Sequence, residues 1–124
     1  MKTAIVILNW NGKKLLEQFL PSIVNFSSEK AEIYVADNAS SDNSVDFIKK
    51  YYPSVHIVQN KSNGGYAKGY NDALQNIDAD IYCLINSDIE VSENWISPVL
   101  EIFKKEKNFF EQIFLYKKGK KSRK

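Results

Sequence analysis

Apolar runs of strand length alternate with amphipathic segments of helix length along most of the chain. The run at residues 4–8 is continuous and rich in β-branched side chains, which favours a buried strand. Residues 13–26 follow with apolar side chains three and four positions apart, as on one face of a helix. Pro21 lies inside this segment, so we expect the helix to kink or restart there. The same alternation predicts strands at 33–36, 55–58 and 81–85, and helices at about 45–51, 65–77 and 96–105.

These eight elements predict the fold class. Each predicted strand is apolar at successive positions, so we expect both of its faces to be covered. Strands that alternate with helices form a parallel sheet whose crossovers are right-handed. The prediction is an α/β fold with a doubly wound, Rossmann-like sheet of about four mostly parallel strands and helices on both faces. Ligands of such sheets bind at the carboxyl ends of the strands.

Amides, carboxylates, hydroxyls and glycines follow every predicted strand, at the edge where ligands bind. Local structure is an alternative explanation for several of them. Asp37 and Asn38 are residue types that form turns, and Ser41 with Asp42 fits a helix N-cap. Asn63–Gly65 fits a turn with positive φ. Trp10 is either a core aromatic or a stacking surface. Asn71 is less easily explained, because it is one amide on an otherwise apolar helix face and a buried amide needs partners. The polar segments are Asn9–Gly12, Asp37–Asp42, Asn60–Gly65 and Asn86–Asp88.

Asp88 follows the fourth apolar run directly, after Asn86 and Ser87. A carboxylate next to a buried strand costs free energy unless it is hydrogen-bonded, paired or bound to a metal. Mg²⁺ and Mn²⁺ prefer oxygen ligands, keep several waters and commonly bridge one or two carboxylates to substrate phosphates. The amide, hydroxyl and carboxylate of this run fit a divalent metal site of this kind.

The distribution of charge narrows the class of partner. The chain of 124 residues fits a single domain with one modest core. Its net charge of +2 is misleading, because six of the seventeen basic residues fall within residues 117–124 and leave eleven basic and fifteen acidic residues before them. The body is therefore acidic, and we expect no nucleic-acid partner for it. The basic tail can contact anionic lipid or RNA, or it can simply be solvated.

The motifs exclude several familiar sites. The first strand is followed by NWNG rather than the glycine-rich dinucleotide fingerprint, and no phosphate-binding loop ending in Gly-Lys-Ser or Gly-Lys-Thr occurs. We interpret His56 as an ordinary sheet residue, and Cys83, the single cysteine, as a small hydrophobe within an apolar run. The chain has no apolar stretch of about eighteen residues and no signal-peptide layout, so we expect a cytoplasmic protein.

Four motifs, in this order and spacing, resemble those of one enzyme family. They are VILNWNG at 6–12, VADNASSDNSV at 35–45, NGGYAKGYN at 63–71 and LINSDIEV at 84–91. Together they resemble the family 2 glycosyltransferases with the GT-A fold. The similarity is greatest to bacterial enzymes that build surface polysaccharides, including rhamnosyltransferase-like members. It covers about residues 3–105.

The resemblance implies transfer of a sugar from a nucleoside diphosphate donor, a UDP- or dTDP-sugar, with Mn²⁺ or Mg²⁺ as cofactor. Asn9 and Trp10 match the residues that line the base and ribose pocket, and Asp37 matches the aspartate that binds the base. The run Asn86–Asp88 matches the family's Asp-x-Asp motif with asparagine first, which makes Asp88 the implied metal ligand. The residues that match the segment beside the ribose and phosphates are Asn63, Gly64, Gly65 and Asn71.

The residue pattern expected of a family 2 glycosyltransferase stops after about residue 107. We expect residues 1–106 to form the nucleotide-sugar-binding half of a GT-A domain, followed by an atypical helix and a basic tail at 107–124. Inverting transfer needs a general base, which in this family lies in the second half of the domain. Neither Glu106 nor Glu111 lies in a matching motif. We therefore expect a truncated chain that binds the donor but does not turn over alone.

An alternative from another functional class is a non-catalytic interaction module of a polysaccharide-synthesis complex. Missing sheet strands would leave an apolar edge exposed, and self-association tends to cover such edges, so we also expect a homodimer. A basic tail that binds lipid would place the chain at the inner face of the membrane. The donor sugar, the nucleotide base and the acceptor are left open by these motifs.

Overall fold

The computed structural model describes residues 1–105. The helix and basic tail expected at 107–124 lie outside the described residues. The chain divides into two compact units, the first comprising residues 1–93 and the second beginning at Asn94. The sheet belongs to the first unit, and the described part of the second contains the helix α4 (Ile96–Lys105).

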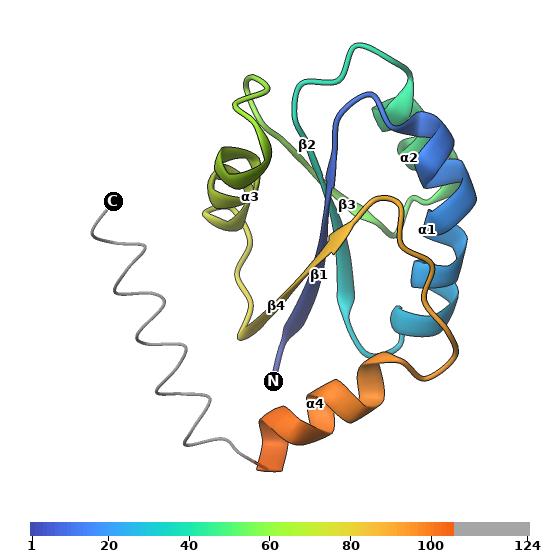
Figure 1. Ribbon diagram of the computed structural model, residues 1–124, viewed down its shortest axis with the longest axis vertical. Coiled ribbons are helices and arrows are strands. Elements are labelled where there is room, and N and C mark those ends of the chain that lie inside the picture. The colour runs from blue at the N-terminus through green and yellow to red at the C-terminus, as the bar shows by residue number, and fades with distance from the viewer. Residues whose placement is uncertain (106–124) are drawn as a thin grey trace. The chain divides into compact units, whose positions relative to one another are not determined.

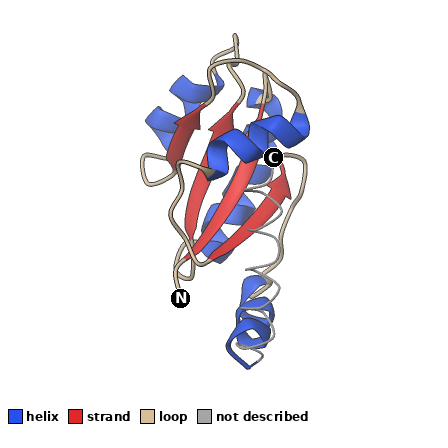
Figure 2. Cartoon of the chain, turned by 90° about the vertical axis from the view of Figure 1, so that its left-hand side faces the viewer, coloured by secondary structure: helices blue, strands red, loops and turns tan. Residues whose placement is uncertain are grey.

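The first unit is built on a sheet of four parallel strands in the order β3-β2-β1-β4. Figures 1 and 2 show these strands side by side, running in the same direction. Their bounds are β1 (Thr3–Asn9), β2 (Glu32–Asp37), β3 (His56–Gln59) and β4 (Ile81–Asn86). In this register Asn9 lies opposite Asp37, Leu8 lies opposite Asn86, and Asp37 lies opposite Gln59. The polar ends of the strands therefore meet at one edge, as the sequence predicts.

Helices cover both faces of the sheet, which confirms the predicted doubly wound α/β fold. The helices α1 (Lys13–Ser27) and α2 (Ser44–Tyr51) lie on one side, and α3 (Tyr66–Leu74) lies on the other (Figure 1). Within residues 1–105, no helix combines the length and the apolar composition needed to cross a membrane.

The core has two layers because successive strand residues point to opposite faces. On the α3 side, Ala4 and Val6 of β1 pack with Tyr70 and Ala73 of α3. The alternate residues of β1, Ile5 and Ile7, are fully buried, as are the α1 side chains Leu16, Leu20 and Ile23.

The prediction that every strand is buried on both faces holds for β1 and β2 but is wrong for β3 and β4. In the described sheet these two strands each pair on one side only. His56 of β3 and Leu84 of β4 are accordingly exposed. An apolar residue pattern alone does not say whether a strand will be central or at an edge.

Among the element boundaries that differ from the predicted ones, the start of β3 and the end of α3 have clear local causes. The third strand begins at His56 rather than Val55, because the amide of Val55 donates to the carbonyl oxygen of Tyr52 (3.0 Å) in the turn after α2. The third helix ends at Leu74 rather than residue 77. There the amide of Ile77 donates to the carbonyl oxygen of Leu74 (3.3 Å), three residues back, and this tighter turn closes the helix.

Pro21 does not restart the first helix, which is continuous from Lys13 to Ser27. A proline removes the hydrogen bond to the carbonyl group four residues earlier, which here belongs to Glu17. Because Glu17 is exposed, water can satisfy this carbonyl oxygen. The free-energy cost of Pro21 is therefore small, and the helix continues past it to bury Ile23 on the same face as Leu16 and Leu20.

Gly69 allows α3 to approach the sheet closely. A β-carbon added there would lie 2.7 Å from Nδ2 of Asn38 and 2.8 Å from Cδ1 of Leu8. The Asn38 side chain is buried and hydrogen-bonded, so it cannot move aside. The sequence reading did not single out Gly69, since a glycine inside a helix usually only lowers helix propensity.

We predict that Gly69→Ala lowers the free energy of unfolding by about 1–3 kcal/mol through overpacking, measured by urea denaturation. Gly64→Ala is the matched control, because its β-carbon meets only the flexible, exposed chain of Lys68. An unchanged or increased stability of Gly69→Ala would contradict the close packing of α3.

Candidate functional site

The buried carboxylate of Asp37 lies at the centre of the polar sheet edge, with only 2% of its surface exposed. Its oxygens accept hydrogen bonds from Nδ2 of Asn9 (2.9 Å), the amide of Ser40 (2.9 Å) and the hydroxyl of Ser40 (2.6 Å). It also borders a pocket of about 350 Å³ whose lining includes Gln59 and Asn60. Asp37 thus forms the local turn with Ser40 that its residue type favours. It also lines a pocket large enough for a small-molecule ligand.

Asn9 and Trp10 follow one another at the end of β1 but face different surroundings. Asn9 is 1% exposed, and its amide group orients Asp37 and also donates to the Ser40 hydroxyl (3.3 Å). Its Oδ1 atom is buried and accepts no hydrogen bond from the described residues, and a β-carbon at Gly12 would lie 2.6 Å from it. Trp10 is 56% exposed, so it is not the core aromatic that one reading of the sequence allowed.

The loops after β1 and β2 are linked through Asn11 and Asp42. Asn11 has a positive φ of 49°, and its Oδ1 accepts hydrogen bonds from the amides of Ser41 (2.7 Å) and Asp42 (3.1 Å). Asp42 accepts in turn from the amides of Lys13 (3.2 Å) and Ser44 (3.0 Å), the first residues of α1 and α2. The N-cap positions of α1 and α2 are Gly12 and Asn43, neither of which makes a side-chain cap hydrogen bond. Asp42 instead caps the first amide of both helices from outside these positions.

The electrostatics of Asp42 follow from these contacts. Burial raises the pKa of its carboxyl group, but the hydrogen bonds from Ser44 and from the amide of Lys13 outweigh it. The net pKa lies below the ordinary value of 3.8. A carboxyl group with a lowered pKa in the folded state stabilises the fold above its unfolded pKa, and this stabilisation is lost as the pH falls through the folded value.

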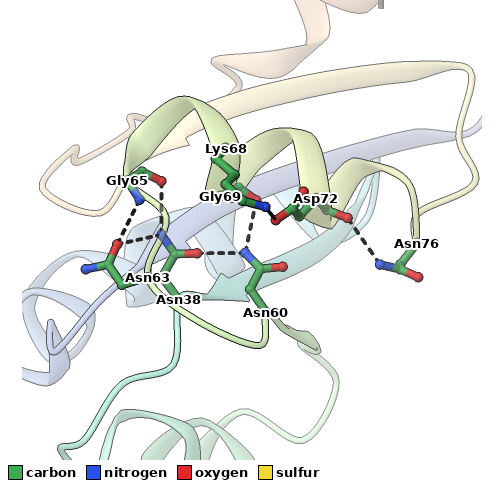
Figure 3. Close-up of polar contacts among 8 residues, drawn as sticks. All are labelled: Asn38, Asn60, Asn63, Gly65, Lys68, Gly69, Asp72 and Asn76. Atoms are coloured by element: carbon green, nitrogen blue, oxygen red, sulfur yellow. Dashed lines mark hydrogen bonds and ion pairs between the residues drawn. The ribbon is translucent and has the colours of Figure 1, made fainter. Parts of the chain in front are cut away.

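An amide network lies beneath the start of α3 (Figure 3). Asn38, at the end of β2, contacts Asn60, Asn63 and the carbonyl oxygen of Gly65. Gly65 has a positive φ of 94°, as expected for a turn in this segment, and its amide donates to Oδ1 of Asn63 (3.0 Å). Gly64 lacks a positive φ, so the predicted positive φ of this turn is confined to Gly65.

The helix α3 also contacts the end of β4 through two tyrosines. The Tyr66 hydroxyl donates to Oδ1 of Asn86, and the Tyr70 hydroxyl donates to the carbonyl oxygen of Ile85 (3.0 Å). Burial raises the pKa of Tyr70 far above its ordinary value, so this phenol remains protonated and serves as a donor. Asn71, expected to be a buried amide with partners, is only half-buried and makes no side-chain hydrogen bond within residues 1–105.

Asp88 lies in the turn just past β4 and is exposed, and Ser87 beside it is half-buried. The expectation that the Asp88 carboxylate would be costly to bury is therefore wrong, whereas its position beyond the carboxyl end of β4 is as expected. Within the described residues, Asp88 accepts no side-chain hydrogen bond, and no three His, Cys, Asp or Glu residues form a metal-binding group. A cation held by Asp88 would take its other oxygen ligands from water and the ligand, which Mg²⁺ and Mn²⁺ commonly do.

Comparison with known proteins identifies the family. The model described as "Glycosyl transferase family 2" matches residues 4–124. The chain belongs to glycosyl transferase family 2. This confirms the family that the four motifs resemble, and the match extends over the residues beyond 105 as well.

Two curated relatives of this family 2 chain come from Bacillus. The chain is 27% identical to an uncharacterized glycosyltransferase, YfnE, of Bacillus subtilis, over 94% of the chain and 32% of the relative. It is 32% identical to a poly(ribitol-phosphate) beta-glucosyltransferase of Bacillus spizizenii, over 71% of the chain and 15% of the relative. The chain therefore spans about a third or less of the length of these relatives.

Two solved structures share the fold of the family 2 chain. The structure of residues 1–349 of TarS from S. aureus in complex with UDP-GlcNAc has a TM-score of 0.74 at 21% identity, over 86% of this chain and 32% of that one. The mannosyltransferase PcManGT from Pyrobaculum calidifontis, in complex with GDP-Man and Mn²⁺, has a TM-score of 0.64 at 22% identity, over 72% and 28% of the two chains. At these identities the likeness establishes the GT-A fold.

We predict that Asp42→Ala lowers the free energy of unfolding at pH 7 by about 1 kcal/mol, because a cap is lost. The difference from wild type should shrink as the pH falls from about 4 through the lowered pKa of Asp42, because the wild-type carboxylate is then progressively protonated. Urea denaturation at pH 7 and near pH 2.5 measures both quantities. Asp88→Ala is the control and should leave stability unchanged, and equal effects of the two variants would contradict the capping role.

Proposed function

We propose that this family 2 chain binds a nucleoside diphosphate sugar, a UDP- or dTDP-sugar, at the carboxyl edge of its sheet. The observation that carries the proposal is the fixed carboxylate of Asp37 at the border of a pocket, on the same sheet edge as Asp88. The complexes of structural neighbours with UDP-GlcNAc and GDP-Man support it. The chain would supply the donor site of an enzyme that acts in cell-surface polysaccharide synthesis, as the curated relatives suggest.

The base and ribose would be held by groups from β1 and β2. The hydrogen bonds from Asn9 and Ser40 orient the Asp37 carboxylate, whose remaining lone pairs can accept an N–H group of a pyrimidine base. Trp10 offers an exposed aromatic face at the end of the neighbouring strand. The Asp37 carboxylate and the Trp10 ring would contact a base, which a nucleotide has and a simple phosphate lacks.

The diphosphate would lie toward the end of β4, with the cation held by Asp88. A bound Mn²⁺ or Mg²⁺ supplies charge neutralisation for the leaving diphosphate when an acceptor hydroxyl displaces it. Asn86 is fixed by the Tyr66 hydroxyl and contributes an amide beside this position. Sugar transfer itself is proposed for the whole family enzyme, and we assign no general base among residues 1–105.

Calorimetric titration of the chain with UDP and dTDP in the presence of Mn²⁺ tests donor binding. We expect saturable binding of at least one nucleotide, weakened by Asp88→Ala because the cation loses its carboxylate ligand. Asp78→Ala, which removes an exposed carboxylate before β4, should bind as wild type does.

Failure of both nucleotides to bind wild type would overturn the proposal. The alternative, an interaction module of a polysaccharide-synthesis complex, predicts instead a binding partner whose affinity survives Asp88→Ala.

Trp10→Ala should weaken nucleotide binding roughly 5- to 150-fold if its ring stacks on the base, since such stacking contributes about 1–3 kcal/mol. The matched control is Tyr51→Ala, which removes an exposed aromatic ring from α2. Equal affinities of the Trp10 and Tyr51 variants would place the base elsewhere.

A further inference from the structure

Asn38 is a buried amide that joins three segments of the chain. It is 2% exposed and lies just past the end of β2, next to Asp37. Its Nδ2 donates to Oδ1 of Asn63 (3.3 Å) and to the carbonyl oxygen of Gly65 (3.2 Å), and its Oδ1 accepts from Nδ2 of Asn60 (2.7 Å). Figure 3 shows the three asparagine side chains pointing toward one another beneath α3.

The network continues from Asn38 into the helix itself. Nδ2 of Asn60 also donates to the carbonyl oxygen of Gly69 (3.0 Å), and the missing side chain of Gly69 leaves room for Asn38 against the helix. The ends of β2 and β3 are therefore joined both to the Asn63–Gly65 segment and to the second turn of α3.

The far side of α3 is attached to β4 rather than to β2 and β3. Tyr66 and Tyr70 contact Asn86 and the carbonyl group of Ile85, as described above. The helix thus spans the sheet edge from the neighbour of Asp37 to the residue two positions before Asp88. Its position sets where the Asn63–Gly65 segment lies relative to the proposed base-binding side and the proposed diphosphate side.

We propose that Asn38 is a positioning residue for donor binding, which holds α3 and the Asn63–Gly65 segment at the spacing the donor requires. The inference rests on the proposed function. Asn38 is buried and is not assigned a contact with the donor; it acts through Gly65 and α3.

The chemistry of the network requires an amide at position 38. One end must donate to two oxygen acceptors while the other accepts from Asn60, and only a side-chain amide of this size does both. An ionised aspartate has the same shape, but it would place an oxygen where the Nδ2 group of Asn38 now donates to the carbonyl oxygen of Gly65. Both oxygens are acceptors, so this hydrogen bond could not form. Asn38→Asp therefore removes the positioning contacts at almost constant volume.

The test compares Asn38→Asp and Asn38→Leu with wild type by UDP titration in the presence of Mn²⁺. We expect both variants to bind UDP about tenfold or more weakly, since each leaves buried polar groups unsatisfied and displaces the segment they hold. Asn38→Leu adds no charge, so a loss shared by both variants does not arise from repulsion of the diphosphate. The matched controls are Asn76→Asp and Asn76→Leu at the exposed end of α3, where Nδ2 donates to the carbonyl oxygen of Asp72 (3.2 Å), and these should bind as wild type does.

Hydrogen exchange of the folded variants separates positioning from general loss of stability. The amide of Gly65 donates to Oδ1 of Asn63, and the amide of Gly69 donates to the carbonyl oxygen of Gly65. Both amides should therefore lose protection from exchange in the Asn38 variants. Amides of β1 should keep theirs. If Asn38→Asp does not fold, Asn60→Asp gives the same comparison from the half-buried side of the network.

Two results would overturn this inference and leave the proposed function intact. The first is an Asn38 variant that binds UDP within about twofold of wild type. The second is an Asn38 variant that binds UDP more weakly but keeps the hydrogen-exchange protection of the Gly65 and Gly69 amides. Wild type that binds neither UDP nor dTDP would instead remove the proposed function, and this inference with it.

Discussion

β1 pairs in parallel with β2 on one side and β4 on the other, and every feature of the candidate site depends on this arrangement. Parallel strands end at the same edge, so the residues at the ends of three different strands converge, although Asn9 and Asp88 are 79 positions apart in the chain. The apolar side chains of β1 supply the burial that holds this geometry. Antiparallel pairing of β1 with both neighbours would leave Asp37 and Asn86 at one edge and move Asn9 to the opposite one.

Local patterns predicted much of the fold because they report local physics. The alternation of apolar runs with amphipathic segments yielded all eight elements and the parallel sheet, and the polar segments after each strand indicated the functional edge. Whether a strand is central depends on which other strands it meets, and this is not encoded near the strand itself. For the same reason the exposure of Leu84, Asp88 and Asn71 was not foreseen.

The amides that organise the site were visible in the sequence but ambiguous. Asn38, Asn60 and Asn11 are residue types that favour turns, and each does follow a strand. Their partners lie on other loops, as the contact between Asn38 and Asn63 across 25 positions illustrates. The recurrence of asparagine after successive strands is the signal in the sequence that corresponds to this shared network.

The two sides of the site differ in how much order exists before a ligand arrives. Asp37 has already lost its rotamer freedom on folding, because three hydrogen bonds fix its carboxylate. Asp88 is exposed and loses that freedom only when it engages a cation. The entropic cost of ligand binding therefore falls mainly on the β4 side, and the β2 side is preorganised.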